Sequence, residues 1–365
     1  MKVALVYDRV NKFGGAERVL LALHEIFPEA PLYTLVYDPP KARWASVFKV
    51  LPTFLNALPF LRSKHELLSP LAPMAFETFN FDEYDVVISV TSSDAKAIIT
   101  KPKTLHLCYC LTPTRYFWSG KGDYEKDIKM RFLPSLFKKY LRTVDLLTSQ
   151  RPDLYIAISK VVKRRIQKYY HQDSEVVYPP IDDKFFAKPL SEDKRKYFLV
   201  VSRLVPYKRI DLVIKTFNKL NLPLLVIGSG REEMKLKRVS AGNIEFLGQV
   251  NDATLIKAYR EAKAVIFPQE EDLGLVPIEA QASGTPVIAY AKGGAMETVI
   301  EGKTGLLFDK QTVSSLAACV ARFEKTDFDY TRCVDNAKKF SIDKFKKEFR
   351  GKVDSAFRHF SDQAA

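Results

Sequence analysis

Apolar residues along this chain gather in short continuous runs, which are separated by longer segments with apolar residues at helical spacing. Continuous apolar runs are typical of parallel strands covered on both faces, whereas a half-exposed strand alternates apolar and polar residues. In the first half of the chain the runs cover residues 3–7, 86–90, 105–110, 155–159 and 175–179. In the second half they cover residues 197–203, 223–228, 243–248, 264–268 and 285–290.

Amphipathic helices are expected between these strands, as in residues 16–27, where Val19, Leu20 and Leu23 share one face. Strand and helix alternate in two blocks, which predicts an α/β protein with two Rossmann-like, doubly wound parallel-sheet domains. Two prolines at 179–180 end the last strand of the first block. We therefore expect an N-terminal domain over residues 1–180, a C-terminal domain over 181–340 and a charged helix over 341–362.

The composition agrees with two globular domains, since 47% of the 365 residues are hydrophobic and 27% are charged. No apolar run reaches the roughly 20 residues that span a bilayer, and the first residues turn polar too soon for a signal peptide. We therefore expect a cytoplasmic protein. Its four cysteines lack zinc-ribbon spacing, so we expect reduced, buried thiols.

The net charge of +14 indicates an anionic partner. Residues 121–168 concentrate the excess, with thirteen Lys and Arg against five Asp and Glu. Residues 131–145 within them predict an amphipathic helix, which fits either an anionic membrane surface or an ordinary surface helix with one face on the core. Charge alone suggests nucleic acid, and no DNA- or RNA-binding motif supports it, so we expect no nucleic-acid partner.

The loop after the first predicted strand contains Gly14 and Gly15 directly before a helix. Glycine lets a backbone approach a ligand closely, and a helix N-terminus offers free N–H groups to an anion. The pair is consistent with ligand binding, and an ordinary tight turn explains it equally well.

Two basic residues follow the first strand of the second block. Arg203 and Lys208 lie five positions apart at an expected strand-to-helix turn. An arginine can bind phosphate oxygens through two hydrogen bonds, and a lysine adds a mobile positive charge. The turn therefore predicts a phosphate site, with a solvated basic loop as the alternative.

Two acidic residues complete the pattern. Glu271 follows the strand at 264–268, and Gly274 permits a close turn before a short helix that begins near Leu275 and carries Glu279. The eight-residue spacing lets both carboxylates face one ligand and accept hydrogen bonds from its hydroxyl groups. The N-terminus of this helix adds a second site for phosphate. Carboxylates that can bind hydroxyl groups, together with basic residues that can bind phosphates, predict a nucleotide sugar as the ligand.

The segments "VSRLVPYKR" (201–209) and "PQEEDLGLVPIEAQASGTPVIA" (268–289) resemble the signature of glycosyltransferase family 4, also called group 1. In that signature an Arg–x4–Lys pair precedes a Glu–x7–Glu motif. The segments "GGAERVLLAL", "PTRYFW" and "GGAMETVIEGKTGLLF" resemble its branch of O-antigen type mannosyltransferases. The resemblance implies a GT-B fold, in which the two Rossmann-like domains face a cleft and the last helix packs back on the N-terminal domain.

The resemblance also implies residue roles. Arg203 and Lys208 would hold the donor diphosphate and stabilise the leaving group, and Glu271 would bind the donor sugar; these three are the expected catalytic residues. Glu279 would bind the ribose. Further donor contacts are implied for Gly14, Gly15, Gly248, Val250, Gly274 and Leu275.

The implied activity is transfer of a hexose with retention of configuration. Mannose from GDP-mannose is the favoured donor, and the acceptor is a lipid-linked or surface-polysaccharide glycan, as in O-antigen biosynthesis. The enzyme would work in the cytoplasm, with peripheral binding to the inner membrane face. No metal or other cofactor is expected, because Arg203 and Lys208 neutralise the diphosphate; the D-x-D sequence at 327–329 is interpreted as a surface turn.

One position departs from the family pattern. The branch usually ends a strand in a "YCHTP"-like turn, and here the turn is "YCLTP" with Leu111. Thr112 and Arg115 are expected to contact sugar or acceptor phosphate, and Tyr116 and Trp118 either stack on a glycan or pack the loop. Because leucine cannot replace the polar contact of histidine, the alternative hypothesis is a protein that binds a nucleotide sugar with little or no transfer.

Overall fold

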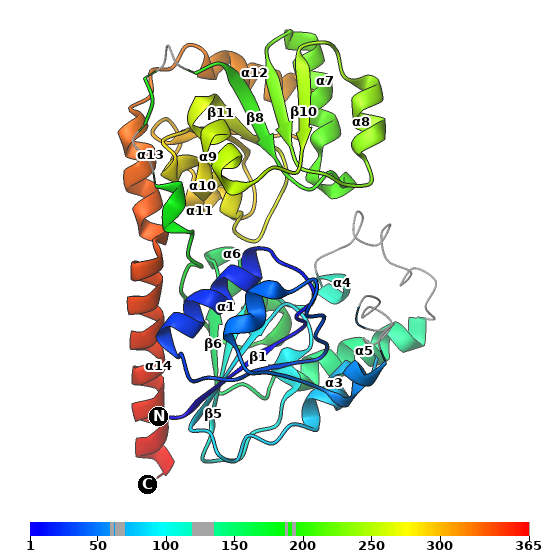
Figure 1. Ribbon diagram of the computed structural model, residues 1–365, viewed down its shortest axis with the longest axis vertical. Coiled ribbons are helices and arrows are strands. Elements are labelled where there is room, and N and C mark those ends of the chain that lie inside the picture. Colours follow the sequence, from blue (N-terminus) through cyan, green and yellow to red (C-terminus); the bar gives the residue numbers. More distant parts are fainter. Residues whose placement is uncertain (59–61, 63–69, 119–134, 187–188, 192–194, 365) are drawn as a thin grey trace. The chain divides into compact units, whose positions relative to one another are not determined.

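A computed structural model describes residues 1–58, 62, 70–118, 135–186, 189–191 and 195–364 (Figure 1). The chain divides into two compact units. The N-terminal unit consists of Met1–Pro180 with Ile342–Ala365, and the C-terminal unit consists of Ile181–Ser341. Among the described residues, every helix is too short or too polar to traverse a bilayer.

The N-terminal unit has a seven-stranded sheet in the order β3-β2-β1-β4-β5-β6-β7, with parallel pairing throughout. Its strands are β1 (Val3–Tyr7), β2 (Leu32–Thr34), β3 (Val50–Pro52), β4 (Val86–Thr91), β5 (Leu105–Cys110), β6 (Leu154–Ala157) and β7 (Glu175–Val176). Its described helices are α1 (Gly15–Ile26), α3 (Ala72–Glu77), α4 (Arg115–Trp118), α5 (Ser135–Thr148), α6 (Lys160–Tyr170) and α14 (Ile342–Ala364).

Both faces of this sheet are covered, which explains its continuous apolar strands. On one face, Val6 and Val87 pack in a cluster with Phe76 of α3. On the other, α14 and α1 lie in contact with each other. Here the ring of Tyr109 in β5 meets Phe349 of α14 edge-on, with ring centroids 5.4 Å apart.

The C-terminal unit repeats this topology in a six-stranded sheet in the order β10-β9-β8-β11-β12-β13, again with parallel pairing throughout. Its strands are β8 (Tyr197–Val201), β9 (Leu224–Ile227), β10 (Ile244–Gly248), β11 (Ala262–Phe267), β12 (Val287–Tyr290) and β13 (Gly305–Phe308). Its described helices are α7 (Ile210–Leu220), α8 (Glu233–Val239), α9 (Asp252–Glu261), α10 (Leu275–Ala282), α11 (Ala295–Thr298), α12 (Val313–Phe323) and α13 (Tyr330–Ala337).

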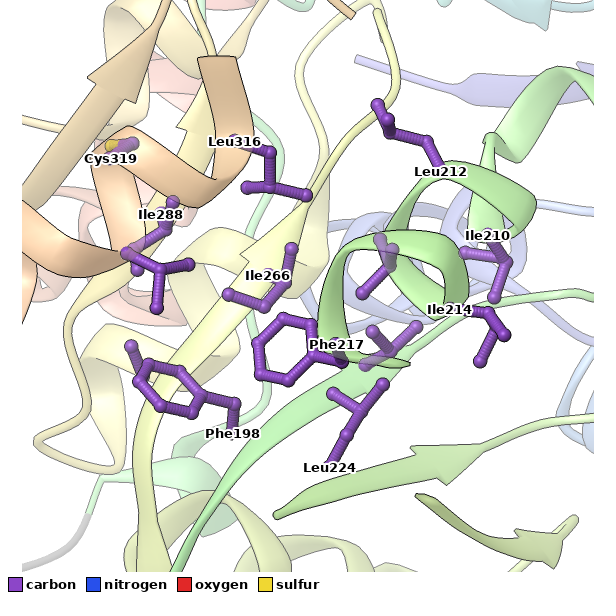
Figure 2. Close-up of a cluster of buried hydrophobic side chains, with 14 of the residues drawn as sticks. Phe198, Ile210, Leu212, Ile214, Phe217, Leu224, Ile266, Ile288, Leu316 and Cys319 are labelled. Atoms are coloured by element: carbon purple, nitrogen blue, oxygen red, sulfur yellow. The ribbon is translucent and has the colours of Figure 1, made fainter. Parts of the chain in front are cut away.

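The core of the C-terminal unit lies between the sheet and the helices α7 and α12. Figure 2 shows Phe198 and Ile266 from the strands, Phe217 from α7, and Leu316 and Cys319 from α12 in one apolar cluster. All four cysteines of the chain are buried free thiols.

The predicted double-wound α/β architecture is confirmed, with differences in individual strands. The apolar runs did not predict β2 and β3, of three residues each, or β13, of four residues. The strand predicted at 175–179 forms ladder pairs only over Glu175–Val176, and the prolines at 179–180 prevent it from extending further. The predicted helix at 131–145 is seen as α5 from Ser135 onward, and residues 131–134 lie outside the described residues.

Candidate active site

The candidate site lies at the carboxyl ends of β8 and β11, which are neighbours in the C-terminal sheet. The chain leaves β8 toward β9 on one side and returns through β11 on the other, so this is the point at which the strand order reverses. Open α/β sheets bind ligands in the crevice at such a point. Arg203 and Lys208 follow β8, and Glu271 follows β11.

Lys208 and Glu271, 63 positions apart, form an ion pair between Nζ and Oε1. Their side chains retain 12% and 18% of their exposure, so both are largely sheltered and both remain accessible. The structure thus brings together a predicted phosphate-binding cation and a predicted sugar-binding carboxylate. A charge pair with this limited contact with water interacts more strongly than an exposed pair.

Arg203 is linked to this pair through Tyr207. The Arg203 guanidinium donates a hydrogen bond to the Tyr207 hydroxyl, and Lys208 Nζ lies 5.1 Å from the centroid of the same ring. The aromatic ring therefore holds two cations near one another by hydrogen bonding and cation–π attraction. Sequence reasoning missed Tyr207, although its position inside the Arg–x4–Lys spacing was a signal.

The loop that carries Glu271 depends on glycine residues, in the loop itself and in the segment packed against it. Gly274 has φ +85°, and a Cβ there would lie 2.7 Å from the ring of Phe267. The N–H of Gly294 donates to the carbonyl of Glu271 at 2.8 Å, and a Cβ on Gly293 would lie 2.3 Å from that carbonyl oxygen. Because these residues have no side chains, the segment after β12 can pack directly against the backbone of the Glu271 loop. The pair Gly293–Gly294 was not among the predicted site residues.

Glu279 differs from Glu271 in its surroundings. It lies in the second turn of α10, is only 5% exposed, and accepts a hydrogen bond of 3.0 Å from the hydroxyl of Tyr259. The prediction that both carboxylates face one ligand remains untested. Tyr259 is fully buried and orients this carboxylate, a role that the sequence did not reveal.

The remaining predicted donor residues lie at strand ends or helix starts. Leu275 is the first residue of α10. Gly248 ends β10, has φ +68°, and accepts a hydrogen bond of 2.7 Å from the N–H of Gly228. Val250 follows at half-buried exposure, just before Asn251 caps α9.

Gly14 immediately precedes α1 of the N-terminal unit, and Gly15 is its first residue. Gly14 has φ −174° and ψ −154°, an extended conformation, so its φ does not require glycine. A Cβ there would lie 3.3 Å from a carboxylate oxygen of Glu17. Glu17 is itself buried and accepts a hydrogen bond of 2.7 Å from the Tyr7 hydroxyl, and burial together with this carboxylate raises the pKa of Tyr7.

The loop after β5 is tied to neighbouring segments by its backbone and by its polar side chains. Leu111 is half-buried, and its N–H donates to the carbonyl of Thr91 at 2.8 Å. Thr112 is buried, and its hydroxyl lies 3.5 Å from a guanidinium nitrogen of Arg165. Arg115 is the first residue of α4.

Trp118, at the end of α4, packs this loop against the rest of the unit. Its ring stacks on Tyr169 with centroids 5.5 Å apart, and its indole N–H donates to Asp145. Of the two predicted roles for this tryptophan, the contacts favour packing of the loop.

The described residues contain no group of three or more His, Cys, Asp or Glu side chains arranged to hold a metal ion. In the D-x-D sequence, Asp329 caps the N-terminus of α13 by accepting from the N–H of Thr331 at 3.1 Å. The same sequence places Phe328 in a stack with Phe323, with centroids 4.9 Å apart. These contacts give the segment a structural role at a helix start.

Residues 181–340 match the family described as glycosyl transferases group 1. A GDP-mannose-dependent monoacylated alpha-(1-6)-phosphatidylinositol monomannoside mannosyltransferase of Corynebacterium glutamicum is 33% identical over 195 residues, which cover 45% of this chain and 51% of the relative. The O-antigen chain mannosyltransferase RfbU of Salmonella typhimurium is 27% identical, over 67% of this chain and 69% of the relative. The Corynebacterium enzyme and two uncharacterised glycosyltransferases of Methanocaldococcus jannaschii align over 51% to 60% of their own lengths, so this chain spans little more than half of these curated relatives.

Solved structures of low identity share the fold. The lipopolysaccharide outer core galactosyltransferase WaaB is 18% identical with a TM-score of 0.70, over 98% of this chain and all of WaaB. Anabaena HepE in complex with UDP-glucose is also 18% identical, with a TM-score of 0.69 over 97% of this chain and all of HepE. The two Rossmann-like units are therefore those of the GT-B glycosyltransferase fold.

Proposed function

We propose that this chain, whose residues 181–340 form a group 1 glycosyltransferase domain, transfers a hexose from a nucleoside diphosphate sugar to a glycan hydroxyl. The observation that carries the proposal is the Lys208–Glu271 ion pair at the switch point of the C-terminal sheet. It offers one cation for a diphosphate and one carboxylate for sugar hydroxyls. The similarity to mannosyltransferases, one of which is GDP-mannose-dependent, supports mannose as the sugar and GDP-mannose as the donor.

The chemistry needs charge stabilisation rather than a strong base. In the proposed step the bond from the anomeric carbon to the diphosphate oxygen breaks, and a bond to the acceptor oxygen forms on the same face, with retention. The acceptor proton passes to the departing diphosphate. Lys208 and Arg203 stabilise the negative charge that develops there, which is the main catalytic contribution in sites of this kind. We propose no metal ion, because these two side chains supply the positive charge.

Each carboxylate has a separate proposed role. Glu271 accepts hydrogen bonds from hydroxyl groups of the donor sugar. Its pairing with Lys208 fixes the position of the sugar-binding carboxylate relative to the phosphate-binding cation. Glu279, oriented by Tyr259, binds the ribose. The Gly274–Leu275 start of α10 binds phosphate through backbone N–H groups. The N-terminal unit binds the acceptor, with Thr112 and Arg115 as its polar contacts.

We further propose that the acceptor is lipid-linked and that the protein binds the cytoplasmic face of a membrane through α5. Leu136, Tyr140 and Leu147 of this helix are 78%, 57% and 64% exposed and share one helical face. The exposed cations Lys139 and Arg142 lie on one side of this stripe, with Lys139 nearer to it. An apolar stripe beside basic residues fits an anionic lipid surface, whereas an ordinary surface helix would turn its apolar residues inward.

The test combines donor binding and turnover. In thermal-shift assays GDP-mannose should raise the melting temperature more than UDP-glucose, UDP-galactose, UDP-N-acetylglucosamine or dTDP-rhamnose. Lys208→Ala and Glu271→Ala should each lower transfer, or donor hydrolysis, by about a hundredfold or more, while both variants stay folded. Near-normal turnover in either variant would contradict the site.

A matched control lies at the opposite end of β11. Lys263 and Glu324 form an ion pair of 3.2 Å in the same unit, far along the strand from Glu271. Replacing each by alanine should change turnover by less than about twofold, because the pair lies away from the candidate site residues and partly exposed pairs contribute little to stability. If the wild-type protein binds a donor tightly and neither hydrolyses nor transfers it, the result favours the alternative hypothesis, in which a protein with Leu111 binds a nucleotide sugar without transferring it.

A further inference from the structure

The carboxylate of Asp145 in α5 gathers hydrogen bonds from four side chains. Oδ1 accepts from Lys96 Nζ and from the Thr114 hydroxyl, each at 2.7 Å. Oδ2 accepts from the Trp118 indole N–H and from the Tyr170 hydroxyl, the latter at 3.1 Å. The donors come from the segment after β4, from the loop after β5 and from α6, so one buried carboxylate joins three parts of the unit to α5.

The charge of Asp145 is matched by a buried lysine. Asp145 and Lys96 are 4% and 1% exposed. Burial by itself would lower the pKa of Lys96, but Asp145, Tyr170 and Asp94 together outweigh burial and hold this pKa above its ordinary value. Lys96 also donates to the carbonyl of Ser93 and lies 5.4 Å from the centroid of the Tyr170 ring. Removal of one member of such a pair leaves an uncompensated buried charge.

A second carboxylate holds the backbone segment that carries Lys96. Asp8, at the end of β1, accepts hydrogen bonds from the Thr91 hydroxyl at 2.7 Å, the Ser92 N–H at 2.8 Å and the Ala95 N–H at 2.9 Å. These bonds fix the short helix Ala95–Ala97 that carries Lys96. The charge that faces Asp145 therefore has a fixed position before any ligand binds.

The same contacts hold both sides of Arg115. Thr114 precedes it and Trp118 follows it by three residues, and both bond to Asp145. The N–H of Thr114 also donates to the Tyr170 hydroxyl at 3.1 Å. The loop from Leu111 to Trp118 is thus anchored at its start by β4 and at its end by Asp145.

We propose that Asp145 is a positioning residue that holds the 111–118 loop in its acceptor-binding conformation before the acceptor arrives. The inference rests on the proposed function only in assigning that loop to the acceptor. Asp145 touches neither substrate; it acts through Thr114, Trp118 and the intervening Arg115. A preformed loop avoids the entropic cost of ordering it on binding and keeps the reacting hydroxyl aligned.

The test is Asp145→Asn, which removes the charge opposite Lys96 and turns one oxygen into a donor that faces other donors. With GDP-mannose as donor and octyl α-mannoside as acceptor probe, kcat/KM for the acceptor should fall by about tenfold or more. The Kd for GDP-mannose should stay within about twofold, since the proposed donor contacts other than Gly14 and Gly15 lie in the C-terminal unit. A fall that matches only the fraction of unfolded protein, or no fall, overturns the proposal.

A matched control and a milder variant separate positioning from general loss of stability. Asp153 accepts from the His106 N–H at 2.8 Å before β6, at the opposite end of the sheet, so Asp153→Asn should leave kcat/KM for the acceptor unchanged. Trp118→Phe removes one loop anchor and keeps the Lys96–Asp145 pair. It should reproduce part of the loss even if Asp145→Asn does not fold.

A measurement that does not depend on turnover tests the positioning role of Asp145 separately from the proposed transfer activity. The chain has two tryptophans, so in a Trp44→Phe background Trp118 fluorescence reports on the loop alone. Asp145→Asn should shift this emission and speed amide exchange at Leu111, Thr114 and Phe117 by about tenfold or more. Unchanged emission and exchange overturn the positioning role even if the wild-type protein proves inactive, in which case the proposed transfer has failed separately.

Discussion

His106 shows how burial decides the chemistry of a single side chain. It lies in β5 with no exposed surface, and its Nε2 is 2.9 Å from the Ser89 hydroxyl of the neighbouring strand. Burial, with a smaller contribution from Arg151, lowers its pKa to about 3. It stays neutral in the folded protein and packs in the core, so it does not take the place of the histidine that Leu111 replaces.

This neutral histidine should make stability depend on pH. Its pKa is about 3 when folded and about 6.5 when unfolded, so below pH 6.5 the unfolded chain binds a proton that the folded protein does not. The free energy of unfolding should therefore fall by about 1.4 kcal/mol between about pH 7.5 and 5.5 on account of His106. Urea unfolding of wild type and His106→Leu at both values measures this as a difference in pH dependence. Equal pH dependence in the two proteins would show that folding does not lower the pKa of His106.

Helix α14 shows how an element distant in sequence completes a domain. Phe345, Phe349 and Val353 of this helix are buried, and its Lys346 and Lys352 pair with Glu25 and Glu175 of the same unit. The apolar side chains cover the face of the sheet that carries Tyr109. The N-terminal sheet therefore depends on residues that follow the whole C-terminal unit in the chain.

Loss of this packing should destabilise the N-terminal unit. Phe349→Ala removes a fully buried ring beside Tyr109 and should lower the free energy of unfolding by about 3–5 kcal/mol. Phe360→Ala, at a half-buried position near the end of the same helix, should cost about 1 kcal/mol or less. Urea unfolding monitored by Trp44 and Trp118, which both belong to the N-terminal unit, measures both effects. Equal costs for the two variants would mean that α14 does not close this core.

At the scale of the whole molecule, charge distribution matters more than net charge. The +14 excess is uneven, because residues 121–168 alone contain thirteen Lys and Arg against five Asp and Glu. Elsewhere many exposed lysines and arginines pair with acids, as Lys237 does with Glu233 and Arg350 with Asp354. Helix α5 combines exposed cations with an exposed apolar stripe. The proposed membrane surface therefore rests on that combination rather than on the excess of lysine and arginine.

Binding to vesicles tests this surface. The protein should bind vesicles of phosphatidylcholine with phosphatidylglycerol more tightly than phosphatidylcholine alone, and raising salt from about 0.1 M to about 0.5 M should weaken binding because it screens surface charge. Replacement of Leu136, Tyr140 and Leu147 by serine should abolish it. Serine at Met234 and Val239, exposed apolar positions of α8, is the matched control and should have no effect. Equal binding by both variants would exclude α5 as the membrane contact.

The sequence alone determined the architecture and the chemical types at the candidate site. Continuous apolar runs predicted covered parallel strands because a strand buried on both faces has no polar side. The spacing of Arg203, Lys208, Glu271 and Glu279 predicted bases for phosphate and acids for hydroxyls, since strand-to-helix loops emerge at one edge of a parallel sheet. Strands β2, β3 and β13 were not predicted and emerged only from their parallel pairing in the folded sheets.

The tertiary structure alone decided which of these residues meet. The Lys208–Glu271 pair joins positions 63 apart, and the support of Glu271 by Gly294 depends on how two loops pack, which no local pattern encodes. The same holds for Asp145, whose partners Lys96, Thr114 and Tyr170 lie 49, 31 and 25 positions away. Sequence periodicity records burial and local conformation, whereas hydrogen bonds and ion pairs between distant segments exist only once the chain has folded.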